Sequence, residues 1–122
     1  MENEETAQTE RRLSLDEMLK LAEHVESWEY SPTRLTGVFG PIIPEHYIGE
    51  TNRISIEVGQ RAATPWGGWL RYIEASYGNL ILGKYPKGLE QNDKLDTLFY
   101  SIQKKIRKRG LDIVNRINES SE

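Results

Sequence analysis

The sequence predicts an α+β domain in which an N-terminal helix and a C-terminal helix pack on the same face of a three- to four-stranded antiparallel sheet. Two segments, residues 14–28 and 92–109, carry apolar residues three and four positions apart, as amphipathic helices do. Between them, residues 53–58, 69–77 and 80–85 are rich in β-branched and aromatic residues, which favour strands. Because such helices and such a sheet cannot bury an apolar face alone, we expect them to pack together.

The N-terminal helix is expected over residues 14–28. Ser14 and Glu17 have the spacing of a capping box, in which each side chain accepts a hydrogen bond from the other residue's amide. The apolar stripe that follows predicts the buried face of this helix and contains Leu15, Met18, Leu19, Ala22 and Val25, flanked by Leu21 and Trp28.

Residues 30–52 contain several Gly and Pro residues and lack a clear period. A structureless segment of this length is uncommon in a compact domain, so we expect it to contain a short strand. The best candidate is Leu35–Phe39.

The three clearer strands form the expected sheet. Residues 53–58 alternate, with Ile54, Ile56 and Val58 facing inward. Residues 59–68 are expected to form a longer loop before the next strand. Gly78 and Asn79 are typical of a two-residue hairpin turn between residues 69–77 and 80–85.

The C-terminal helix is expected to begin at a cap formed by Asn92 or Asp93 and to end before Gly110, a residue type favoured just after a helix. Residues 111–117 are ambiguous, because their apolar residues fit a strand or a short helix. The expected core contains Leu15, Met18, Leu19, Ala22, Val25, Ile54, Ile56, Val58, Ile73, Leu80, Leu82, Leu95, Leu98, Phe99, Ile102 and Ile106.

The length of 122 residues fits one domain, which we expect at residues 13–118, between a disordered acidic tail at 1–12 and a loose tail at 119–122. No apolar run is long enough for a membrane helix or a signal peptide, so no membrane partner is expected. The absence of Cys excludes disulfides, thiolate metal sites and thiol nucleophiles, and a cytoplasmic location is the simplest expectation.

Charge is unevenly distributed along the chain. Residues 1–30 carry nine acids and three bases, whereas residues 53–116 carry twelve bases and six acids. This asymmetry is compatible with an acidic or nucleic-acid partner, and equally with an acidic N-terminal segment that covers a basic surface of the same molecule.

Catalytic chemistry is not indicated. Of the two histidines, His24 falls on the polar side of the first helix and His46 lies in a Pro-rich segment beside Glu45. Glu57 and Glu74 are possible neighbours on adjacent strands, but ordinary exposed sheet positions explain them better. The sequence therefore predicts no catalytic, cofactor-binding or metal-binding residues and no cofactor, and it disfavours an enzyme.

One candidate binding site is the loop that contains Arg61, Trp66 and Trp69. Arg and Trp are the residue types that anchor protein interfaces, and a Trp between Pro and Gly has no obvious reason to be buried. The alternative is that Trp66 folds back as a lid on the edge of the core.

A second candidate is the basic end of the C-terminal helix, where Tyr100, Lys104, Arg107 and Lys108 lie opposite the apolar stripe. An aromatic residue among bases can follow a phosphate backbone, although a solvated helix end explains the pattern as well. We therefore expect a protein-binding or self-associating module. The alternative is a nucleic-acid-binding protein that uses the three-stranded sheet or this basic helix end.

Overall fold

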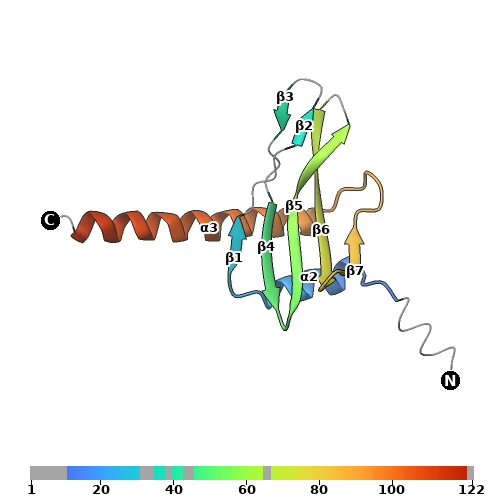
Figure 1. Cartoon of the computed structure of the whole chain (residues 1–122), viewed down its shortest axis with the longest axis horizontal. Coiled ribbons are helices and arrows are strands. Elements are labelled where there is room, and N and C mark those ends of the chain that lie inside the picture. The colour runs from blue at the N-terminus through green and yellow to red at the C-terminus, as the bar shows by residue number, and fades with distance from the viewer. Residues whose placement is uncertain (1–10, 31–34, 38–39, 43–45, 65–66, 121–122) are drawn as a thin grey trace.

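The computed structural model describes residues 11–30, 35–37, 40–42, 46–64 and 67–120 (Figure 1). Its main sheet has five antiparallel strands in the order β1-β4-β5-β6-β7, and β2 and β3 form a separate two-stranded hairpin. The elements in chain order are α2 (Leu15–Glu23), β1 (Trp28–Tyr30), β2 (Leu35–Gly37), β3 (Gly40–Ile42), β4 (His46–Thr51), β5 (Ile54–Thr64), β6 (Gly67–Tyr77), β7 (Leu80–Tyr85) and α3 (Asp93–Ser120).

Both helices pack on one face of the sheet, which confirms the predicted α+β class. Met18 of α2, Ile56 of β5 and Phe99 of α3 are fully or almost fully buried and belong to one apolar cluster. In Figure 1, α3 crosses the strands and continues well past β1, while α2 lies near the lower end of the strands in this view. The sheet, covered by two helices, forms a two-layer domain.

The core is close to the one expected. Buried members of the predicted set are Met18, Ala22, Val25, Ile56, Val58, Ile73, Leu95, Phe99 and Ile102, while Leu15, Leu19, Ile54, Leu82, Leu98 and Ile106 are partly buried against them. Leu80 was wrongly predicted, because it follows the hairpin turn and is 60% exposed. Trp28, Tyr47 and Ala75 are also buried in this core and were not predicted.

Helix α2 has the predicted capping box at Ser14 and Glu17, but it ends at Glu23, five residues before the predicted end. After the helix, the amide of Val25 donates to the carbonyl of Ala22. The chain then turns, and Trp28 begins β1 while still reaching the core. Val25 is buried from the turn after α2, and Trp28 is buried from β1. Their apolar spacing was therefore wrongly interpreted as part of the helix.

Two strands of the main sheet were not predicted. β1 has only three residues, and β4 has Gly49 near its centre, a residue type that is rare in strands. The predicted strand at 35–39 overlaps β2, which pairs with β3 outside the main sheet; Val38 and Phe39 lie outside the described residues.

The loop predicted at residues 59–68 was wrong for most of its length. β5 continues to Thr64 and pairs with β6 through Gln60↔Arg71 and Ala62↔Trp69. This extension was not predicted, because its side chains are polar or small and do not alternate with apolar ones. Backbone pairing between strands does not require such alternation.

Helix α3 runs through Gly110, so the predicted end of this helix was wrong and residues 111–117 are helical. Asn92 caps the helix, since its Oδ1 accepts a hydrogen bond from the amide of Lys94. A glycine inside a helix costs only about 1 kcal/mol, which the good helix formers around Gly110 can offset.

Both edges of the main sheet are covered at specific points. The amide of Leu13 donates to the carbonyl of Leu82 on β7, and Arg12 donates to the carbonyl of Ile81. At the other edge, Arg109 of α3 donates to the carbonyl of Trp28 on β1. Such contacts discourage pairing with another sheet edge.

Among the described residues, neither helix combines the length and apolarity needed to span a bilayer.

Candidate functional site

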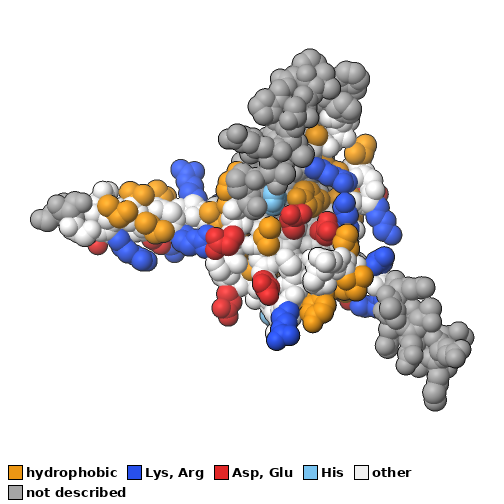
Figure 2. Space-filling view, in the orientation of Figure 1, with side chains coloured by type: hydrophobic (Ala, Val, Ile, Leu, Met, Phe, Trp, Pro, Cys, Tyr) orange, Lys and Arg blue, Asp and Glu red, His pale blue; other side chains and the backbone are white. Residues whose placement is uncertain are grey.

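The most unusual feature of the fold is the second half of α3, residues Arg107–Ser120, which we call the arm. Every residue of the arm is exposed, and Figure 1 shows it projecting beyond β1. At 1.5 Å per residue, fourteen helical residues extend about 21 Å. Figure 2 shows hydrophobic side chains gathered along this projecting helix. They include Leu111 (52% exposed), Ile113 (49%), Val114 (49%) and Ile117 (58%).

Two apolar side chains of the arm, Ile113 and Ile117, continue the buried face of α3. At about 100° per residue, Ile113 falls about 20° from Ile106, and Ile117 falls on the line of Phe99. Phe99 is buried against the sheet and Ile106 packs on the core, whereas Ile113 and Ile117 lie beyond the sheet edge. The helix thus carries its core-facing stripe past the surface that the sheet offers.

Arg109 fixes the point at which the arm leaves the domain. Its guanidinium donates to the Trp28 carbonyl at 2.9 Å and to the Ser27 hydroxyl at 3.0 Å. The same group lies 3.6 Å from a carboxylate oxygen of Glu29. The root of the arm is therefore attached to β1, and the arm has a defined direction.

Three of the four predicted phosphate-contacting residues meet in one hollow beside the root of the arm. This tyrosine hollow, of about 530 Å³, is lined by Tyr30, Tyr47, Tyr100, Gln103, Lys104, Ile106 and Arg107. Tyr30 and Tyr100 are about half exposed, and Tyr47 is buried. Lys108 is exposed and does not line the hollow. The sequence indicated the bases, but the contribution of β1 and β4 was missed with those strands.

Tyr100 is held in place by Arg71 of β6. The Arg71 guanidinium donates to the Tyr100 hydroxyl at 2.7 Å and lies over the rings of Phe99 and Tyr100 at 5.3 and 5.1 Å. Asp96 lies 3.8 Å from the same guanidinium. These contacts join α3 to the sheet and leave one side of Tyr100 open.

The predicted binding loop is divided between the two faces of the sheet. Trp69 pairs with Ala62, and Arg61 is the next residue along β5, so Arg61 and Trp69 point to opposite faces. Trp69 is 44% exposed, whereas the Arg61 guanidinium donates to the Gly88 carbonyl at 3.3 Å. Trp66 lies outside the described residues, so its predicted role as anchor or lid stays a prediction.

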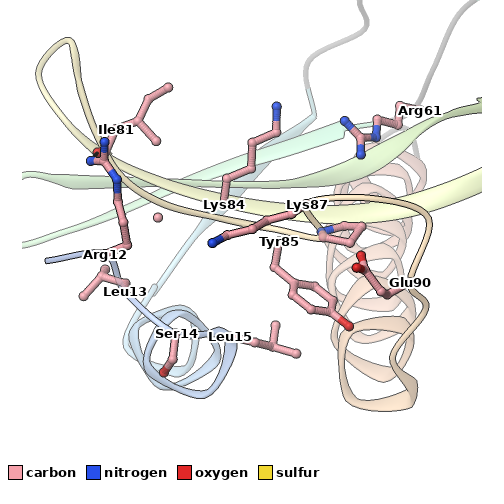
Figure 3. Close-up of a pocket in the computed structure, with 12 residues that line it drawn as sticks. Arg12, Leu13, Ser14, Leu15, Arg61, Ile81, Lys84, Tyr85, Lys87 and Glu90 are labelled. Atoms are coloured by element: carbon pink, nitrogen blue, oxygen red, sulfur yellow. Dashed lines mark hydrogen bonds between the residues drawn. The ribbon is translucent and has the colours of Figure 1, made fainter. Parts of the chain in front are cut away.

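A larger hollow, of about 730 Å³, lies between residues 12–15, β7 and residues 86–90 (Figure 3). Lys84 and Tyr85 point to opposite sides of β7 in this view. Arg12 and Arg61, at the two ends of the hollow, donate to backbone carbonyls of Ile81 and Gly88. Arg12 thus binds the backbone of the edge strand β7, and Arg61 binds the backbone of the loop at residues 86–90.

Glu57 and Glu74 face each other directly in the β5–β6 register, and both are half-buried rather than exposed as expected. Tyr72 hydrogen-bonds to Glu57, and its own burial, followed by the negative charge of Glu57, raises the pKa of Tyr72 well above its usual value. His46 is 6% exposed, with its Nε2 3.7 Å from an oxygen of Glu57. Within the described ranges, no three His, Asp or Glu side chains are placed to hold a metal ion.

Comparisons of the chain with protein-family models, curated proteins and solved structures find no match.

Proposed function

We propose that this chain is a protein-binding module that self-associates through its arm. The observation that carries the proposal is the apolar surface of Leu111, Ile113, Val114 and Ile117, exposed on a helix that extends past its own sheet, with Ile113 and Ile117 on the line of its core-facing stripe. Contiguous exposed apolar surface of this kind is typical of an interaction site.

The length of the arm supports the same proposal. Isolated helices shorter than about 12–15 residues are only marginally stable in water, and helices in proteins depend mainly on packing of an apolar face. Gly110 weakens the arm further. A second helix packed on the stripe would provide the missing contacts.

The test compares two substitutions of equal charge on opposite sides of the arm. Ile113→Asp places a carboxylate in the stripe, whereas Asn115→Asp places one on the polar side. Light scattering after size exclusion should cover protein concentrations of about 1–100 μM, the range in which a dimer of micromolar affinity forms. We expect wild type and Asn115→Asp to dimerise and Ile113→Asp to remain monomeric. A monomeric wild type at the highest concentration would overturn the proposal.

The tyrosine hollow favours a second candidate function, binding of single-stranded nucleic acid. Tyr30 and Tyr100 offer half-exposed rings on which bases can stack, and Lys104 and Arg107 offer charges for phosphates. Each neutralised phosphate of a single strand contributes about −0.7 to the slope of log affinity against log salt. Lys104 and Arg107, together with the neighbouring Lys108 outside the hollow, therefore predict weak binding that is lost at physiological salt.

Fluorescence anisotropy with labelled oligonucleotides at low and physiological salt distinguishes the two functions. We expect no useful affinity at about 0.15 M salt, where dedicated specific binders reach about 10 nM. Tight binding there, lost when Lys104, Arg107 and Lys108 are all changed to Ala, would place the nucleic-acid function first.

A further inference from the structure

We propose that two copies pair through their arms in antiparallel orientation, with the end of each arm seated in the tyrosine hollow of the other copy. This inference rests on the proposed self-association. It adds the direction of the pairing and the surface that receives the partner.

The charges of α3 favour the antiparallel orientation. Residues 104–109 contain five bases and no acid, whereas residues 110–120 contain Asp112, Glu119 and a single base, Arg116. Parallel arms would place the five bases of one copy beside the five of the other. Antiparallel arms place them beside the acidic end of the second copy, where the helix dipole is also negative.

The spacing of the apolar residues supplies a register. Ile106, Gly110, Ile113 and Ile117 are separated by four, three and four residues, as in the contact seam of paired helices. Opposing Gly110 to Ile113 of the second copy also opposes Ile106 to Ile117 of the second copy. Nothing lies within 4 Å of a Cβ built on Gly110, so the second helix can approach closely there.

The same register brings the arm end to the tyrosine hollow. Ile106 lines that hollow, so Ile117 of the second copy falls against it, near the exposed ring of Tyr30. Glu119 of the second copy falls at the level of Lys104, which lines the hollow as well. An apolar side chain with a following carboxylate matches a hollow of aromatic rings and bases.

Cross-linking tests the orientation directly, because the chain has no Cys and every introduced thiol is unique. Lys104→Cys and Glu119→Cys both lie at exposed positions. In the antiparallel pair, the two copies of residue 119 are about 22 Å apart along the helix axis, at 1.5 Å per residue. A short bismaleimide should therefore join a mixture of the two variants and should not join Glu119→Cys chains to each other.

Glu119→Cys chains that cross-link mainly with each other would overturn the antiparallel orientation. A wild type that dimerises, with no cross-link in any combination, would overturn pairing through the arms. A wild type that is monomeric would instead overturn the proposed function itself, so the two failures are distinguishable.

A matched pair of tyrosine variants tests the hollow. Tyr30 and Tyr77 are both about half exposed, but only Tyr30 lines the hollow. We expect Tyr30→Ala to weaken dimerisation at least about tenfold and Tyr77→Ala to leave it unchanged, as for central and remote residues of an interface. Equal dimerisation by Tyr30→Ala and wild type would show that the tyrosine hollow does not receive the arm of the second copy.

Discussion

The surroundings of Gly49 explain why β4 carries a residue type that is unusual in a strand. A Cβ on Gly49 would lie 2.4 Å from Cγ1 of Val25 and 3.0 Å from the Trp28 ring. Because both neighbours are buried, Gly49→Ala should lower the free energy of unfolding by about 1–3 kcal/mol, the usual cost of overpacking. Urea denaturation measures this loss. An unchanged midpoint would show that Val25 and Trp28 do not pack on Gly49.

Arg71 is the residue on which the attachment of α3 to β6 depends. Arg71→Ala removes the hydrogen bond to Tyr100, the contact with Asp96 and the stacking on Phe99. We expect a loss of about 1–3 kcal/mol of stability, with a smaller loss for Tyr100→Phe, which removes only the hydrogen bond. Thermal denaturation of both variants compares them. Equal losses would mean that the hydrogen bond alone accounts for the role of Arg71.

The raised pKa of Tyr72 predicts that the protein loses stability at high pH. Burial, followed by the charge of Glu57, raises its pKa in the folded state above the unfolded value of about 10. The folded state therefore keeps a proton that the unfolded state loses, and this contribution is present below about pH 10 and lost as pH rises further. The free energy of unfolding should fall less steeply above pH 10 in Tyr72→Phe than in wild type. Equal slopes would exclude this role of Tyr72.

Helix α3 continues through Gly110, and the arm depends on this continuity. Gly110→Pro removes a helical hydrogen bond and should break α3 at the arm, while Gly110→Ala keeps the helix. Since every residue that the structure describes after Gly110 is exposed, we expect Gly110→Pro to lose dimerisation but to keep the near-UV circular dichroism of the folded domain. A dimeric Gly110→Pro variant would show that association does not need a continuous helix.

The elements that local chemistry determines could be predicted from the sequence. The Ser14 and Glu17 cap and the stripe of α3 depend on residues a few positions apart, and both were found. β1 and β4 were not predicted, because contacts between residues far apart in the sequence determine them. Trp28 of β1, for example, pairs with Gly49 of β4. The end of α3 was missed because Gly110 favours a stop only as a weak local preference.

For the whole molecule, the candidate site was only partly predictable. The sequence identified Tyr100, Lys104 and Arg107, since aromatic and basic residues on one helix face are visible from spacing alone. It did not show that Tyr30 and Tyr47 complete a hollow with them, because the strands of both were missed. The exposed stripe of the arm also needed the structure, since only the position of the sheet edge separates core residues of α3 from those beyond it.

Backbone hydrogen exchange of the arm measures whether a second copy stabilises this helix. At a concentration where the wild type is dimeric, we expect amides of residues 111–117 to exchange slowly in wild type and in Asn115→Asp. In Ile113→Asp the same amides should exchange almost as fast as in an unfolded peptide, while those of the β5–β6 core keep their protection. Arm amides equally protected in wild type and Ile113→Asp would contradict the account.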